Sequence, residues 1–266
     1  MPTTYTHYAY GQDVFYNLPP KIQKEIRPYM DYYNIGVHGP DILFYYHCFH
    51  KNKINQYGVE IHNRPAEVFF RHAFRVFGRH RGRKAEAAYL AGFMTHFILD
   101  SDCHPYIRKR MEETGISHEE IEADWDSQML RRDHKNPVRY KRARHIRTDL
   151  IAARVIAPYY HKTPRQIQVS LINMKWIVNY VFRSGFGVKK LIASCVNHFV
   201  SPKINLRQFF TKEEINPKNI DTCHHLWELY EESQPVCVKM ITEMYQALIK
   251  KDISFCHQKR LFRDFS

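Results

Sequence analysis

Five residues between His96 and Glu122 have the side chains and the spacing of a metal site. His96, Asp100 and His104 are each four residues apart, and His118 and Glu122 repeat that spacing after a short gap. Residues four apart lie on one face of a helix, one turn above another. Two adjacent helices would therefore present imidazoles and carboxylates to one point, a donor set that suits hydrolytic zinc chemistry.

The first row of ligand-type residues stands in an otherwise apolar stretch. Residues 85–101 are mostly Ala, Leu, Phe, Met and Ile, which predicts a helix buried on most sides. Leaving Asp100 and two imidazoles unpaired there would cost on the order of several kcal/mol. A hydrogen-bonded Asp–His network in the core is the alternative for a single pair. Five such residues in two helical rows favour a metal site over a hydrogen-bonded network.

The elements next to these rows have recognisable boundaries. His104-Pro105 is predicted to end or bend the apolar helix, because proline disfavours helix at the residue before it. Ser117 is a good N-cap, with Glu120 at the capping-box position, for a helix that extends to about Arg132.

The rest of the chain also has a helical pattern, without an internal repeat or an obvious linker. A helix is predicted from Leu18-Pro19-Pro20 to about Tyr33, with breaks at Gly36, Gly39 and Pro40. Residues 50–60 are predicted to be a polar loop. Further helices are predicted over about 65–80, over 163–200 as a pair divided near Ser184-Gly185, and over 220–251 with a break near Pro235. The predicted fold is one compact all-α domain over residues 1–266.

The composition is that of a packed, basic protein. Of the 266 residues, 44% are hydrophobic, and the small number of glycines (10) argues against a β-sandwich. The net charge of +13 favours anionic partners: phosphate esters, anionic membrane surfaces or nucleic acid. The basic stretches 71–84 and 131–147 could make such contacts, or could simply be solvated faces.

The cysteines and the termini bear on the compartment. The six cysteines are scattered without a C-x-x-C pair, which fits reduced thiols in a cytosol. The N-terminus has no basic region followed by an apolar one, and no window approaches 18 apolar residues. We therefore expect a cytoplasmic protein that meets a membrane peripherally, if at all.

Together with His7, Asp41 and His62 upstream, the two rows resemble the zinc-dependent phospholipase C family. That family is related to the bacterial broad-range phospholipases C and to the S1/P1-type nucleases. The segments Gly39-Pro40-Asp41-Ile-Leu-Phe and His96-Phe-Ile-Leu-Asp100 carry much of the likeness, which is best over about residues 1–130.

The resemblance implies a compact all-α fold with three zinc ions in a cleft. One zinc would be held by Asp41, His62, His96 and Asp100. Asp100 would bridge to a second zinc, held by His7 and the chain's own N-terminus. The third would be held by His104, His118 and Glu122.

Three positions carry particular expectations. Asp41 is implied to be the general base as well as a ligand. Pro2 would be the N-terminal ligand if Met1 is removed, where the relatives have a processed Trp. His104 departs from the relatives, in which the gap after the aspartate is longer and proline precedes the histidine.

Outside these rows the expectations are weaker. Helical spacing from His118 puts Asp126 on the ligand face, as a hydrogen-bond acceptor for a ligating imidazole. The other histidines are expected near the cleft (His38, His47, His50) or on the surface (His72, His80, His134, His145, His161). His225 and Trp227 could shape the cleft wall.

The sequence thus predicts a zinc-dependent phosphodiester hydrolase. The favoured reaction is phospholipase C-type cleavage of phospholipids by a zinc-bound hydroxide. The alternatives are an S1/P1-type phosphodiesterase acting on nucleotides or nucleic acid, and a non-catalytic, zinc-stabilised binding protein.

Overall fold

Helices account for most of the structure, a computed structural model that describes residues 3–80, 83–182 and 212–266. The α-helices are α1 (Thr4–Asn17), α2 (Pro20–Ile26), α3 (Met30–Gly36), α4 (Lys53–His62), α5 (Ala66–Arg79), α6 (Lys84–Thr114), α7 (His118–Arg132), α8 (Leu150–Ile156), α9 (Pro164–Trp176) and α11 (Ile220–Lys250). Short turns of helix join them: η1 (Arg27–Tyr29), η2 (Gly39–Tyr45), η3 (Ala157–Tyr160), η4 (Ile177–Val181), η6 (Pro217–Asn219), η7 (Ile253–His257) and η8 (Lys259–Phe262). The described residues include no strand, which confirms the all-α prediction.

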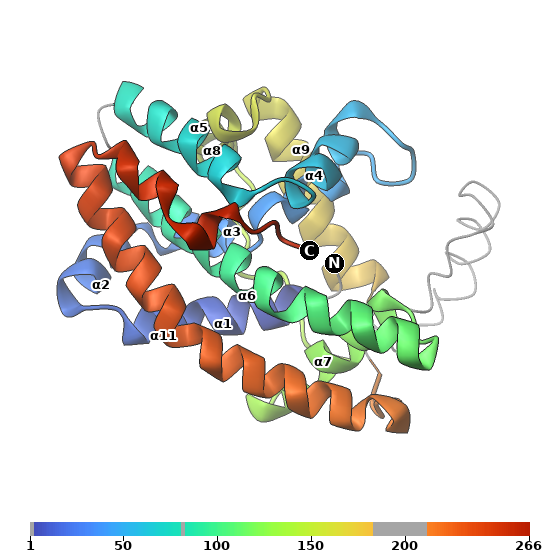
Figure 1. Cartoon of the computed structure of the whole chain (residues 1–266). Helices are drawn as coiled ribbons and strands as arrows, with labels where there is room; N and C mark the ends of the chain where they lie inside the picture. The colour runs from blue at the N-terminus through green and yellow to red at the C-terminus, as the bar shows by residue number, and fades with distance from the viewer. Residues whose placement is uncertain (1–2, 81–82, 183–211) are drawn as a thin grey trace.

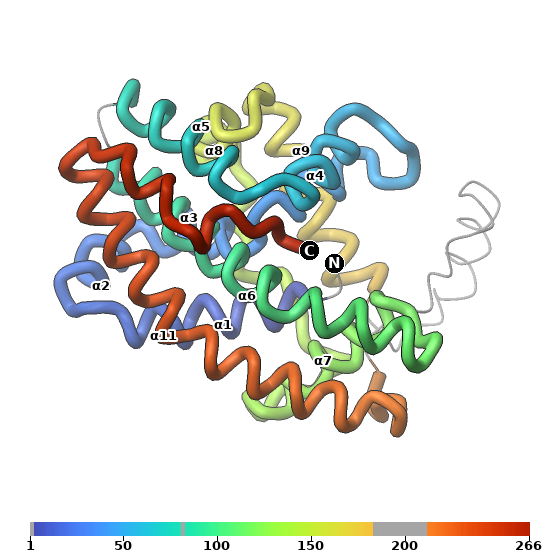
Figure 2. The backbone as a smooth tube through the Cα atoms, viewed as in Figure 1, coloured from blue at the N-terminus to red at the C-terminus, as the bar shows by residue number. Residues whose placement is uncertain are grey.

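The long helix α6 is the axis around which the others pack. Figures 1 and 2 show it running diagonally, with α11 alongside and α1 behind. Its apolar stretch from Glu86 to Ser101 is buried, as the sequence pattern predicts. It crosses α3 at close range, because a Cβ on Gly92 would lie 2.1 Å from the Tyr33 carbonyl oxygen. A side chain at that crossing would push α3 and α6 apart.

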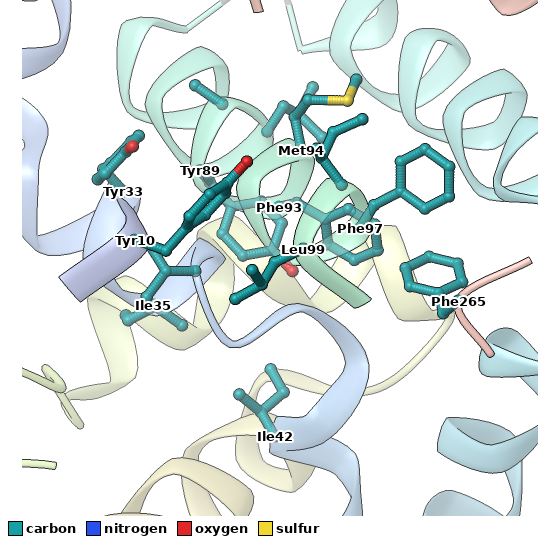
Figure 3. Close-up of a cluster of buried hydrophobic side chains, with 14 of the residues drawn as sticks. Tyr10, Tyr33, Ile35, Ile42, Tyr89, Phe93, Met94, Phe97, Leu99 and Phe265 are labelled. Atoms are coloured by element: carbon teal, nitrogen blue, oxygen red, sulfur yellow. The ribbon is translucent and has the colours of Figure 1, made fainter. Parts of the chain in front are cut away.

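Aromatic rings fill the core around α6. Figure 3 shows Tyr10, Tyr33 and Phe93 among the buried side chains, and Phe265 of the C-terminal segment close to Phe97. The rings of Phe265 and Phe97 have centroids 5.1 Å apart, edge to face. Residues far apart in the sequence therefore share one core.

The prediction that His104-Pro105 ends or bends the apolar helix is wrong about the end, since α6 continues to Thr114. Pro105 lacks an N–H, so the carbonyl of Ser101, four residues earlier, loses its intrahelical donor. The Arg263 guanidinium donates a hydrogen bond to that carbonyl. A contact from the other end of the chain thus satisfies the group that proline leaves unpaired.

Other predicted boundaries also need correction. Residues 50–60 are mostly helix rather than loop, because Asn52 and Asn55 form a capping box at the start of α4. Pro235 does not break α11, because it lies on the exposed side of that helix, where water can satisfy the carbonyl. The predicted helix from Leu18 to Tyr33 is interrupted by the 3-10 turn around Pro28.

Several predictions stand as made. Helix α5 covers the predicted range 65–80, and α7 ends at Arg132. Ser117 accepts the Glu120 N–H, as an N-cap should, although the Glu120 side chain binds Lys212 instead of closing the box. Helix α9 and η4 fill the first part of 163–200, whereas Ser184-Gly185 lies outside the described residues. No described helix is long and apolar enough to cross a membrane.

Candidate metal centre

The predicted ligands converge on one cavity of about 280 Å³. It lies where α1, η2, α4, α6 and the start of α7 meet. Seven of the predicted ligands line it (His7, Asp41, His62, Asp100, His104, His118, Glu122), together with Phe44 and Glu119. The eighth, His96, is fully buried beside the carboxylate of Asp100.

The ligand atoms fall into three groups, each with atoms within 4.8 Å of one another. Two inner groups share an imidazole: His7, His96 and Asp100 form one, and Asp41, His62 and His96 the other. The outer group is His104, His118 and Glu122. The resemblance assigns His96 to a single zinc, whereas here its imidazole lies within reach of both inner groups.

Asp100 is the common neighbour of the groups. Its Oδ1 lies 3.2 Å from Nε2 of His7 and 3.6 Å from Nε2 of His104, while Oδ2 lies 3.1 Å from Nε2 of His96. Burial alone would raise the pKa of this carboxyl, but the imidazoles around it hold that pKa well below its usual value. An ionised carboxylate at this point can bridge two cations.

The outer group is more open to solvent. The side chain of His118 is 28% exposed and that of His104 is 15% exposed, and Nε2 of His118 lies 3.1 Å from Oε1 of Glu122. Burial opposes protonation of His104, but Asp100 and Glu122 raise its pKa to about 9. Without a metal, this imidazole is therefore cationic at neutral pH.

Unpaired polar atoms show that the residues present fit a metal. Nδ1 of His96 and Nδ1 of His7 are buried without a hydrogen-bond partner among the described residues, and Nε2 of His96 makes no hydrogen bond although Oδ2 of Asp100 lies 3.1 Å away. Burial lowers the pKa of His96, which leaves the ring neutral and able to donate a lone pair. Buried orphan imidazole nitrogens beside ionised carboxylates are the donor set that zinc prefers.

The backbone around η2 is shaped to bring Asp41 to His96. Gly39 has a φ of 46°, and a Cβ there would lie 2.1 Å from Cδ2 of His96. Only glycine permits both the conformation and the approach. Nδ1 of His62 donates to the Gly58 carbonyl at 2.7 Å, which turns Nε2 toward Oδ1 of Asp41, 3.1 Å away.

Asp126 acts on the site through the backbone, not through an imidazole as expected. Its buried carboxylate accepts the N–H groups of Tyr5 and Thr6 at 3.2 and 2.8 Å, and Nη1 of Arg142 lies 2.9 Å away. These N–H groups belong to the first turn of α1, which has no cap of its own. Asp126 therefore caps α1 from α7 and so positions His7.

The N-terminal prediction can be followed only in part. Pro2, the expected terminal ligand, lies outside the described residues. Thr3 is described, and its Oγ1 donates to Oε1 of Glu122 at 3.4 Å.

Several secondary expectations differ from the structure. His145, expected on the surface, stacks on Tyr8 and shares a 2.7 Å hydrogen bond with His38. His47 and His50 are exposed and do not line the cavity. Trp227 stacks on Tyr230 instead of forming a cleft wall.

The remaining secondary expectations involve charge pairs. His225 pairs with Glu228 at 2.7 Å and does not line the cavity. In the basic stretch 131–147, Arg142 is buried against Asp126 rather than solvated. That side chain is therefore part of the fold and takes no part in a basic surface.

Sequence reasoning missed three residues at the site. Phe44, whose ring stacks on His62, and Glu119 line the cavity. Phe44 comes one turn after Asp41, and Glu119 directly follows His118. Phe265 also contacts the site, through a hydrogen bond from Nδ1 of His104 to its carbonyl at 2.6 Å. No local pattern marks Phe265, because backbone groups make its polar contacts.

The fold and the site together define an all-α metalloprotein with room for up to three ions in adjacent groups. A profile of the family described as zinc-dependent phospholipase C matches residues 6–184, about two thirds of the chain. The protein belongs to the zinc-dependent phospholipase C family, and the three groups are consistent with up to three zinc ions. No curated protein and no solved structure matches the chain.

Proposed function

We propose that the protein is a zinc-dependent phosphodiester hydrolase that cleaves phospholipids in the manner of a phospholipase C. The observation that supports this most directly is the convergence of three ligand groups around Asp100, with Asp41 lining the same cavity. Membership of the family favours a phospholipid over other phosphodiesters.

The zinc ligands and Asp41 would have different roles in the reaction. Bound zinc would supply Lewis acidity toward the phosphoryl oxygens and lower the pKa of a water toward ~7. The Asp41 carboxylate would orient the attacking water and take up its proton. Burial would raise the pKa of Asp41, but its hydrogen bond with His62 and the nearby imidazoles hold that pKa below its ordinary value. The orienting role therefore suits Asp41 better than that of a strong base.

The outer group would serve the leaving group. His104, His118 and Glu122 line the same cavity as Asp41, and His118 is 28% exposed whereas Asp41 is 11% exposed, so an alkoxide that leaves beside His118 can reach solvent. The cavity is slightly smaller than a typical drug-sized site. Its volume suits a phosphoryl headgroup, with the acyl chains remaining outside.

A panel assay tests this proposal. Protein of known zinc content is offered phosphatidylcholine, other phospholipids, bis-p-nitrophenyl phosphate and single-stranded DNA, with and without chelator. We expect chelator-sensitive cleavage, with phospholipid the best substrate. Preferred cleavage of DNA would support the nuclease alternative, and turnover of none by zinc-replete protein would support the binding-protein alternative.

Asp41 provides the residue-level test. Asp41→Asn keeps the shape but loses the charge, so kcat should fall by about 100-fold or more with zinc content retained. Asp31→Asn is the matched control, because the Asp31 side chain is 61% exposed and pairs with Arg147 outside the cavity. Full turnover in Asp41→Asn would rule out its proposed role.

A further inference from the structure

The last residues of the chain run across the back of the metal site. After α11, residues 251–266 (the C-terminal segment) pass between α5 and α6 in Figures 1 and 2, where they are drawn in dark red. This segment lies entirely outside residues 6–184, the part matched by the family profile. The match to the family therefore carries no information about the contacts that this segment makes with the site.

Backbone hydrogen bonds fix the segment against the elements that carry ligands. The Ala66 N–H donates to the Arg263 carbonyl at 2.9 Å, and the Phe265 N–H donates to the His62 carbonyl at 3.2 Å. The Phe265 ring is fully buried, with its centroid 5.4 Å from that of His62 and 5.9 Å from that of His96. The segment thus touches ligands of both inner groups from behind.

The Phe265 carbonyl also selects the tautomer of an outer ligand. A carbonyl oxygen only accepts, so Nδ1 of His104, 2.6 Å away, must carry a proton. Nε2 is then the nitrogen available to a metal, and it faces Oε1 of Glu122 at 3.6 Å. His62 is oriented in the same way by the Gly58 carbonyl of its own helix. For His104 the orienting carbonyl lies 161 residues away.

Arginines in the segment support the helix that carries His104. Arg263 donates to the Ser101 carbonyl, which Pro105 leaves without an intrahelical donor. It also binds the Asp102 carboxylate, with Nη1 2.9 Å from Oδ1. These contacts fall in the turn of α6 between Asp100 and His104, so they determine how His104 projects into the cavity.

We propose that the C-terminal segment positions the outer group, and that Phe265 is the residue that orients His104 for metal binding. Ligating imidazoles commonly donate their other N–H to a carbonyl, and losing such a partner typically lowers metal affinity about 10–100-fold. The inference depends on the three ligand groups holding metal and is independent of which phosphodiester is cleaved.

A pair of phenylalanines in the segment allows a matched test. Phe265 is fully buried, whereas Phe262 is 50% exposed. Phe265→Ala removes the ring that anchors the carbonyl, so it should release about one zinc ion per chain at a chelator concentration that leaves the wild type and Phe262→Ala fully loaded. The ¹⁵N resonances of His104, recorded on zinc-free protein at a pH where the ring is neutral, should show a mixture of tautomers in Phe265→Ala only.

A second pair of variants keeps the test decisive if Phe265→Ala folds poorly. Arg263→Met should weaken the same zinc site. Pro105→Ala restores an N–H to bond the Ser101 carbonyl, so the double variant should regain part of the lost affinity. Pro105 is exposed, so Pro105→Ala alone should fold normally.

Two results would overturn the proposal. One is full zinc retention with unchanged His104 resonances in Phe265→Ala. The other is loss of zinc from all groups in step with a lower unfolding temperature, which would make the segment a structural cover only. The zinc readout needs no substrate, so a chain that binds zinc normally and hydrolyses no phospholipid would contradict the proposed function alone.

Discussion

The inner groups and the outer group reach their geometry by different means. The inner ligands lie on the buried half of α6 and on α1, η2 and α4, and His96 and Asp100 are almost inaccessible to solvent. The outer ligands lie farther along α6 and in the first two turns of α7, and His104 depends on a carbonyl from the C-terminal segment. We conclude that burial and contacts close in sequence organise the inner groups, whereas the outer group also depends on a contact from a distant part of the chain.

The largest expected effect comes from removing the carboxylate of Asp100, which belongs to an inner group and lies 3.6 Å from Nε2 of His104 in the outer group. Asp100→Asn should remove zinc from the inner groups, weaken the outer site, and lower activity by more than the ~10–100-fold typical of losing a residue that only orients a ligand. His118→Ala should release only the outer ion. Metal content by mass spectrometry, with kcat on the same samples, measures both. Equal zinc loss in the two variants would mean that the groups are not distinct.

An intermediate effect concerns pH. Zinc binding at the outer group must displace a proton from His104, whose pKa in the metal-free chain is about 9. Outer-site affinity should therefore rise by about tenfold per pH unit from about 6.5 to 9. Among the inner ligands, burial opposes protonation of His7 but Asp100 raises its pKa, whereas burial lowers the pKa of His96, so of these two only His96 needs no such displacement. Competition titrations with a chelator of known pH dependence would measure the slope.

The same ionisation affects the metal-free fold, with a definite sign. A raised histidine pKa adds stability that is complete below the unfolded value of about 6.5 and is lost as pH rises through the folded value. The zinc-free protein should therefore lose stability between about pH 6.5 and 9. Denaturant midpoints of chelated protein across this range would show it, and a flat profile would contradict the proposed charge state of His104.

The smallest expected effect lies at the cavity mouth. Glu119 lines the cavity but belongs to none of the three groups. Glu119→Gln should leave zinc content unchanged and raise the KM for a cationic headgroup only a few-fold, because an exposed ion pair contributes about 0.2–1 kcal/mol. Glu112→Gln, on an exposed turn of α6, is the control. A loss of zinc in Glu119→Gln would place this carboxylate inside the outer group.

The sequence predicts best what repeats with the helix period. His96, Asp100 and His104 could be placed on one helix face from their spacing alone, as could His118 and Glu122. His7, Asp41 and His62 lie on separate elements, so spacing cannot bring them together. Only the likeness to a known family pointed to them.

What the sequence could not predict is carried by contacts between distant residues. Pro105 predicts a helix end by every local rule, and the compensating Arg263 stands 158 residues later. Asp126 has the helical position of a partner for an imidazole, but it is occupied by backbone N–H groups of α1. A local sequence pattern does not show which distant group will form a hydrogen bond with an unpaired donor or acceptor.

The capping of α1 by Asp126 also affects the order in which the protein can assemble. His7 is synthesised long before α7, yet two N–H groups in the first turn of its helix lack their acceptor until Asp126 is in place. Closing a loop of that length is entropically costly and slow compared with forming a local helix. Zinc capture by His7 should therefore follow the folding of most of the chain instead of nucleating it, so a ribosome-bound fragment ending before α7 should lack this ion.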